Sequence, residues 1–203
     1  ESSANLIRLG VAKKNIVFSG SEYQIADKAL CLNLAKAYQA LQLLVNTIAG
    51  LRKIYVMAWE GGHPDHDAAH LLGVTLARDL AMLDNCFQFP LYNAGNLSKL
   101  RRVRLFNPLA ANGSVTSYKI GLVARCFFLR LACNYPSQKK VLCWLLPLLI
   151  YHYIFCGTQI LQAVSWARIF ERPDPLALRY EYNGFYSYPD FREAVTKFIQ
   201  DHS

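Results

Sequence analysis

Histidine and acidic side chains are scarce in this 203-residue sequence. There are five histidines, none before His63, and 14 Asp and Glu stand against 22 Lys and Arg, for a formal net charge of +8. No nucleic-acid-binding motif accompanies this charge, so we expect no nucleic-acid partner. The six cysteines include no C-x-x-C pair, and we interpret them as reduced thiols. Without a basic start or an apolar signal run, we expect a cytoplasmic protein.

Repeats and low-complexity segments are also missing from the sequence. The length suits one domain that buries a sizeable core. We therefore predict a single domain over residues 1–203. Residues 1–140 would form a sheet core with the site, and residues 141–203 would form apolar helices and a closing segment.

The first part of the chain alternates between helix and strand patterns. We expect a helix over residues 2–9, a short buried strand over 15–18, a long helix with an apolar stripe from Leu30 to Ile48, and a strand over 54–58. The strand, helix and strand predict a βαβ unit with parallel strands. The fold class is therefore α/β.

Later segments carry weaker patterns. Residues 86–92 alternate like a strand that Pro90 would end or confine to an edge. Residues 100–106 could form another strand, residues 118–133 a helix, and residues 191–199 a short final helix.

Residues 141–164 contain no charged side chain and are long enough to span a bilayer. Proline, glycine and polar residues interrupt the run, which favours a buried or interfacial helix pair over a membrane span. The run Lys99–Arg104 is the densest basic cluster, and it is either a solvated edge or a site for phosphate or anionic headgroups. Peripheral membrane contact through these two segments is therefore possible.

The chemistry-bearing residues gather in residues 59–70, directly after the strand over 54–58. His63 and His66 stand three residues apart with Asp65 between them. Pro64 suits the first turn of a helix, which we predict over residues 64–82. Both histidines would then lie at a helix N-terminus, beyond the carboxyl end of a strand, where open parallel sheets bind ligands.

This spacing favours a metal-assisted hydrolytic site. His66 is the candidate ligand for zinc or another divalent metal, because a helix N-terminus helps keep its imidazole neutral. His63 is the candidate acid or oxyanion stabiliser, and Asp65 would orient an imidazole. His70 is expected to be a helix-face residue without chemistry. A phosphohydrolase of the HD type, with a doublet at His66 and Asp67, is a weaker alternative because no second doublet is present.

The run Gly61-Gly62-His63-Pro64-Asp65-His66-Asp67-Ala68 resembles the second conserved block of the LmbE-like zinc de-N-acetylases. This is the PIG-L type family of N-acetylglucosaminyl-phosphatidylinositol, mycothiol-pathway and bacillithiol-pathway deacetylases. The flanking runs NLIRLGVAKKNIVFSG, Tyr135-Pro136-Ser137-Gln138 and Tyr180-Glu181 are similar to further family elements.

The resemblance covers roughly residues 3–190. It implies a Rossmann-like three-layer domain with a mostly parallel sheet, and zinc-dependent removal of an N-acetyl group from an N-acetylglucosamine-type sugar or glycolipid. It also implies that His66 binds zinc and that His63 stabilises the transition state.

One family block has no counterpart here. A His-Pro-Asp-Asp-Glu-like run after the first strand supplies two more zinc ligands and the general base, and no histidine precedes His63. Either that block and its strand were lost by truncation, or the protein is an inactive relative that serves as a binding or membrane-peripheral module. We expect this chain by itself to be inactive, and the sequence leaves its oligomeric state open.

Overall fold

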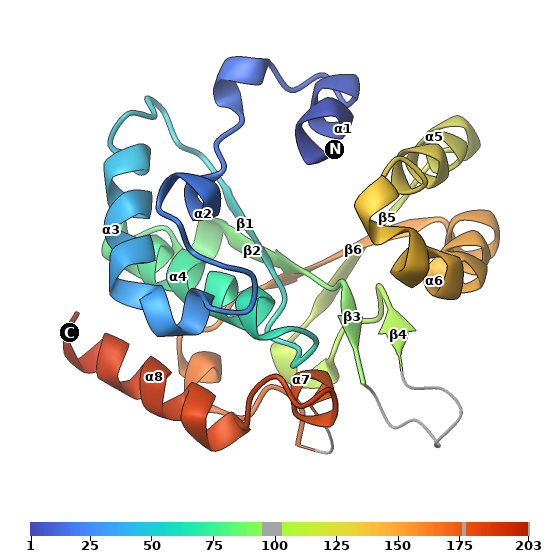
Figure 1. The fold of residues 1–203 in the computed structure, drawn as a ribbon. Helices are drawn as coiled ribbons and strands as arrows, with labels where there is room; N and C mark the ends of the chain where they lie inside the picture. The colour runs from blue at the N-terminus through green and yellow to red at the C-terminus, as the bar shows by residue number, and fades with distance from the viewer. Residues whose placement is uncertain (95–102, 176–177, 203) are drawn as a thin grey trace. The chain divides into compact units, whose positions relative to one another are not determined.

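The chain forms two compact units (Figure 1). The computed structural model describes residues 1–94, 103–175 and 178–202. The helical unit comprises residues 1–18 and 117–159, and the site unit comprises residues 19–116 and 160–203. The single domain expected over residues 1–203 remains a prediction.

A mixed four-stranded sheet has the strand order β1-β2-β6-β5. Its strands are β1 (Ile54–Met57), β2 (Cys86–Phe89), β6 (Thr158–Ala163) and β5 (Val115–Lys119). β1 and β2 are parallel, with Ile54 opposite Cys86, whereas β2 and β6 are antiparallel, with Phe87 opposite Ala163. The α/β class is therefore confirmed, but the mostly parallel, Rossmann-like sheet that we expected is wrong.

The antiparallel strand arises from the apolar segment that we interpreted as a helix pair. Residues 139–156 are helical, and the chain then reverses at Gly157, which has the left-handed values φ +58° and ψ +40°. The Gly157 amide donates to the carbonyl oxygen of His152 at 2.7 Å, which closes the helix. Glycine adopts this conformation without a Cβ penalty, so the chain can enter β6 in the next residue.

The strand expected over residues 15–18 does not form. Lys13–Asn15 is a 3-10 turn, and Val17 and Phe18 are 45% and 49% exposed. An apolar run becomes a strand only where a neighbouring strand takes its backbone hydrogen bonds, and this run has none. The parallel crossover is instead β1, α4 (Pro64–Asp79) and β2, and β1 lies at an edge of the sheet within the described residues.

Most helices fall close to the predicted positions. The predicted helices correspond to α3 (Leu34–Val45), α4 and α8 (Tyr188–Gln200) in the site unit, and to α1 (Ser2–Arg8), α5 (Leu122–Ala132) and α6 (Lys139–Tyr151) in the helical unit. The short helices α2 (Ser19–Glu22) and α7 (Arg179–Tyr182) of the site unit were not predicted. α5 is shorter than expected because β5 takes residues 115–119. A second small sheet pairs β3 (Tyr92–Asn93) with β4 (Arg104–Leu105), and residues 95–102, with most of the basic run Lys99–Arg104, lie outside the described residues.

The core of the site unit lies between α3, α4 and α8 (Figure 1). Tyr38 from α3 meets Phe198 from α8 edge to face, with ring centroids 5.5 Å apart. Leu72 and Leu76 of α4 are buried, whereas Leu80 is 39% exposed because α4 ends at Asp79. This core holds α4 against β1 and so fixes the place where α4 begins.

We predict that Gly73→Ala destabilises the site unit by about 1–2 kcal/mol. A helical alanine would ordinarily gain about 1 kcal/mol over glycine. Here its Cβ would lie 2.3 Å from Cγ1 of Val56, a stiff β-branched side chain, and overpacking costs about 1–3 kcal/mol. Urea unfolding measures the effect.

Two variants serve as controls for this packing argument. Gly20→Ala, also helical but with its nearest neighbour at 3.9 Å, should be neutral or slightly stabilising. In a Val56→Ala background, Gly73→Ala should cease to destabilise. Equal losses in both backgrounds would contradict the contact between α4 and β1.

Candidate functional site

The loop Trp59–Gly62 joins β1 to α4 and carries the candidate site at its end. Pro64 is the first helical residue, and His63 is the N-cap, with extended backbone angles. The His63 Nδ1 atom accepts a hydrogen bond from the Asp65 amide at 3.2 Å. A proline with no amide hydrogen and a side-chain acceptor at the cap together begin α4 at this point.

His63 and His66 face each other, with ring centroids 5.1 Å apart. Burial lowers the pKa of His63, and burial together with the nearby His63 lowers the pKa of His66 to about 4. The carboxylates of Asp65 and Asp27 oppose the lowering of the His63 pKa, and that of Asp27 opposes the lowering of the His66 pKa, without overcoming either shift. Both imidazoles are therefore neutral at pH 7, in the form that binds metals.

Hydrogen bonding separates the roles of the two rings. Because the His63 Nδ1 atom accepts a hydrogen bond, the neutral ring carries its proton on Nε2. The Nδ1 atom of His66 is buried and has no hydrogen-bond partner among the described residues. An unpartnered buried nitrogen is unfavourable unless a ligand or a metal engages it.

Asp65 meets His63 through its backbone and not through its carboxylate. Its carboxylate oxygens accept from the amides of Lys28 at 2.6 Å and Leu30 at 3.1 Å. These bonds fix a turn in which Lys28 has a positive φ of 66°. Asp65 thus positions His63 by its amide, while its carboxylate is committed to holding the chain before α3.

Two buried carboxylates anchor the loop itself. Asp67 accepts from the amides of Glu60 and Gly61 at 3.2 Å. Glu60 accepts from the amides of Leu91 and Tyr92, both at 2.8 Å. Burial raises the pKa of Asp67 and raises the pKa of Glu60 to about 7. Neither carboxylate faces the imidazoles as a free ligand, because both are committed to backbone amides.

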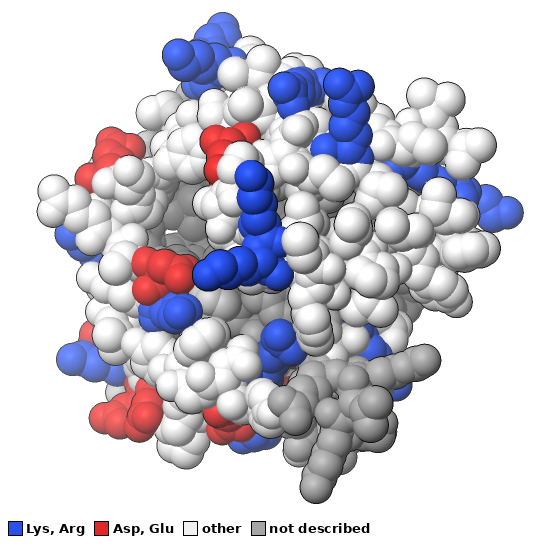
Figure 2. All heavy atoms as spheres, turned by 45° about the vertical axis from the view of Figure 1, so that its right-hand side comes forward, with Lys and Arg blue, Asp and Glu red and all other residues white. Residues whose placement is uncertain are grey.

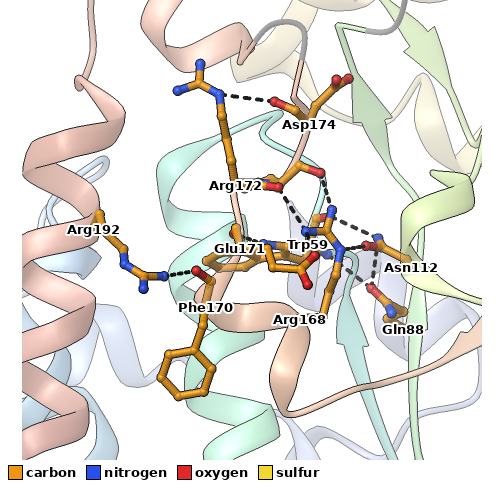
Figure 3. A network of polar contacts seen from close by, with 10 residues as sticks. Trp59, Gln88, Asn112, Arg168, Phe170, Glu171, Arg172, Asp174 and Arg192 are labelled. Atoms are coloured by element: carbon orange, nitrogen blue, oxygen red, sulfur yellow. Dashed lines mark hydrogen bonds and ion pairs between the residues drawn. The ribbon is translucent and has the colours of Figure 1, made fainter.

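A second buried network holds Trp59 at the start of the loop (Figure 3). The Trp59 amide donates to Gln88 at 3.1 Å, its indole donates to the Glu171 carbonyl oxygen at 3.1 Å, and its own carbonyl accepts from Asn112 at 2.9 Å. Arg168, only 5% exposed, donates from Nε to the Asn112 side chain at 3.0 Å. The loop is therefore fixed at both ends by buried polar contacts.

The aromatic and basic side chains around the histidine pair were not predicted from the sequence. Tyr92 lies 5.4 Å from the His66 ring between centroids, and Phe185 lies 6.1 Å from the His63 ring. The Arg179 guanidinium lies 5.8 Å from the Tyr92 centroid, and the Lys28 ammonium 4.1 Å from that of Phe185. Tyr92 could have been found, because it follows β2, whose carboxyl end lies beside that of β1. Phe185 is distant in sequence and carries no such signal.

The remaining three histidines make contacts of their own. His70 is fully buried in α4, and its Nδ1 atom lies 2.8 Å from the Met57 carbonyl oxygen. His202 lies near the C-terminus, with its Nδ1 atom 2.8 Å from the Phe198 carbonyl oxygen. His152 belongs to the helical unit and is buried there. We assign no chemistry to these three residues.

The residues that the structure describes do not by themselves fit a catalytic zinc centre. Such a centre uses three protein ligands and an open position. Over the described ranges, no group of three His, Cys, Asp or Glu side chains is arranged to hold a metal ion. The pair of His63 and His66 offers two imidazoles, and the carboxylates of Asp65 and Asp67 are taken up by backbone amides.

A largely apolar cavity of about 490 Å³ adjoins β1. Its walls include all four β1 residues and Asp27, Asp65, Leu72 and Phe89. The cavity follows the edge strand and reaches the carboxylates beside the histidine pair, although His63 and His66 are not among its lining residues.

Comparisons with protein-family models, with characterised proteins and with solved structures find no match. The functional assignment therefore rests on the geometry of this site and on the resemblance of its sequence.

We predict that Glu60 makes the protein less stable as pH rises from about 4.5 to 7. Its folded pKa of about 7 lies above the ordinary 4.5, so the folded state holds the proton more tightly. The stabilisation is fully present below pH 4.5 and is lost as pH rises through 7. The shift corresponds to about 3 kcal/mol.

Urea unfolding of the wild type and of Glu60→Gln at several pH values tests this prediction. Asp67 and the histidines are present in both proteins. The difference between the two free energies of unfolding therefore reports the titration of Glu60. The wild type should lose about 2–3 kcal/mol relative to the variant between pH 4.5 and 8. Parallel pH profiles would contradict a buried, protonatable Glu60.

Proposed function

We propose that this chain carries part of the active site of a zinc-dependent hydrolase that removes an N-acetyl group from an N-acetylglucosamine-type sugar conjugate. The observation that supports the proposal is the neutral pair at the carboxyl end of β1: the buried, unpartnered Nδ1 of His66 next to the ring of His63. The block Gly61–Ala68, which resembles the LmbE-like family, supplies both residues.

His63 acts as a hydrogen-bond donor to the oxyanion in this proposal. Its Nδ1 atom is occupied by the Asp65 amide, so Nε2 carries the proton of the neutral ring. Burial lowers the pKa of His63, which disfavours the imidazolium that a proton donor needs. A fixed, neutral N–H beside the reacting carbonyl stabilises the negative charge that develops there.

His66 would be one metal ligand through its Nδ1 atom, which has no hydrogen-bond partner among the described residues. When bound, zinc supplies carbonyl polarisation and an activated water in enzymes of this kind. The described side chains do not complete a metal centre around His66, so further ligands would be needed. The unpaired edge of β1 and its apolar cavity offer a place where a strand bearing the family's first block can add.

A catalytically inactive binding module is the second candidate. The commitment of Asp65 and Asp67 to backbone amides favours it, because neither carboxylate is free to act as a base. In that case the aromatic rings of Tyr92 and Phe185 around the histidine pair would bind a sugar without cleaving it. A metal requirement distinguishes the two candidates.

We predict that His66→Ala abolishes both zinc binding and N-acetyl hydrolysis. The variant removes the imidazole whose buried Nδ1 atom has no hydrogen-bond partner in the described part of the chain. Metal content per chain and release of acetate from an N-acetylglucosaminyl conjugate are the two measurements. His202→Gln, at the chain end, is the matched control and should retain both. A metal-free protein that still binds the sugar would favour the binding module.

We predict that His63→Ala lowers kcat about 100-fold or more, whereas His63→Gln retains a substantial part of the activity. Glutamine offers a neutral N–H near the position of Nε2, and alanine does not. Zinc content should stay unchanged in both variants, which separates this role from that of His66. Equal losses in the two variants would instead indicate that His63 donates a proton.

A further inference from the structure

The helix formed by Pro136–Cys156 presents an apolar stripe to solvent. Val141, Trp144, Leu148, Tyr151 and Phe155 are spaced by alternating steps of three and four residues, which places them on one helix face. Their exposed fractions are 52%, 55%, 38%, 60% and 73%. Continuous exposure of this kind on a folded helix marks an interaction surface.

The same helix has a separate buried side. Leu149 and His152 are 8% and 9% exposed. In the most apolar 18-residue stretch of this helix, however, only 6% of the stretch is buried. The core helix of a globular protein is mostly buried. α5 adds further exposed apolar side chains, with Leu122 at 65% and Val123 at 85%. The exposed apolar stripe is therefore distinct from the side of the helix that packs inside the unit.

Nearly all of the chain's net positive charge belongs to this unit. The helical unit has a single acidic side chain, Glu1, against eight basic ones, so it carries +7 of the chain's formal +8. The basic residues are Arg8, Lys13, Lys14, Lys119, Arg125, Arg130, Lys139 and Lys140. Figure 2 shows neutral side chains bordered by Lys and Arg, without Asp or Glu, on the right-hand part of the view.

The topology of the segment excludes a single membrane crossing. The Ile120 amide donates to the Gly157 carbonyl oxygen at 2.8 Å, so residues 121–156 leave and return at the same place. A crossing helix would separate its ends by about 30 Å. α5 has 11 residues, or about 16 Å, and carries Arg125 and Arg130, so it cannot provide the return crossing.

We propose that the helical unit docks on the surface of an anionic lipid bilayer. The apolar stripe of Pro136–Cys156 and the first turn of α5 enter the interface, and the basic side chains, Lys139 and Lys140 foremost, contact the headgroups. Apolar insertion and attraction to anionic lipid act together in such binding. Glu1, the one acidic side chain of this unit, accepts hydrogen bonds from the amide and hydroxyl of Ser137 at the start of the helix. The eight basic side chains outweigh it, and this excess of positive charge favours an anionic lipid partner. The proposal is independent of the proposed hydrolase.

Co-sedimentation with vesicles tests the proposal. The protein should bind vesicles of phosphatidylcholine with one third phosphatidylserine and should bind pure phosphatidylcholine at least about 10-fold more weakly. Raising the salt concentration from 0.05 to 0.5 M should weaken binding to the anionic vesicles. Trp144 fluorescence should shift to shorter wavelength on binding, and Trp144→Phe should remove the shift.

Matched variants locate the surface. Val123→Ser with Phe155→Ser, and separately Lys139→Gln with Lys140→Gln, should each weaken binding about 10-fold. Leu43→Ser, 58% exposed in the site unit, and Lys36→Gln with Lys197→Gln should leave binding within about two-fold. Circular dichroism establishes that each variant is folded.

Three results would overturn the proposal. The first is equal affinity for neutral and anionic vesicles, and the second is binding that survives both helical-unit variants. The third is a dimer in sedimentation velocity that the Val123→Ser and Phe155→Ser double variant dissociates, because a second copy would then cover the stripe.

Discussion

Two buried carboxylates, Glu60 and Asp67, hold the loop on which the candidate site depends. Each accepts backbone amide hydrogens, Asp67 from the loop itself and Glu60 from the segment after β2. Buried carboxylates are costly unless they are hydrogen-bonded, and these bonds offset part of the cost. The result is a rigid connection between β1 and α4, and the first two turns of α4 carry both imidazoles. These contacts, together with the hydrogen bond from the Asp65 amide to His63, place the two imidazoles.

The same contacts limit what the site can do. Three carboxylates lie close to the imidazoles in sequence, and all three bind backbone amides, which leaves none free to ligate a metal or to act as a base. Besides the Asp27 carboxylate, which acts on both rings, the site has a pair of neutral imidazoles. One carries its proton on Nε2, and the other has an Nδ1 atom without a hydrogen-bond partner among the described residues. This pair suits one half of a hydrolytic centre. The unpaired edge of β1 and its adjoining cavity suggest where the other half would join.

The two compact units of the chain differ in their physical character. The site unit has a packed core and nearly balanced charge, whereas the helical unit combines exposed apolar side chains with eight basic residues and one acidic residue. A surface that is both apolar and basic is unfavourable in water alone and favourable at an anionic interface. A substrate attached to lipid would bring the proposed chemistry and the proposed docking surface to the same membrane.

Local patterns in the sequence were sufficient to predict β1, the start of α4 at Pro64 and the proximity of His63 to His66. Each of these features depends only on residues that are close together in the sequence. Tertiary structure decided the rest. Residues 15–18 lack a partner strand, residues 158–163 find one in β2, and the Asp65 carboxylate turns to the chain before α3. Each of these outcomes depends on hydrogen bonds between residues far apart in sequence, and those partners are set by the fold as a whole and not by the local run of side chains.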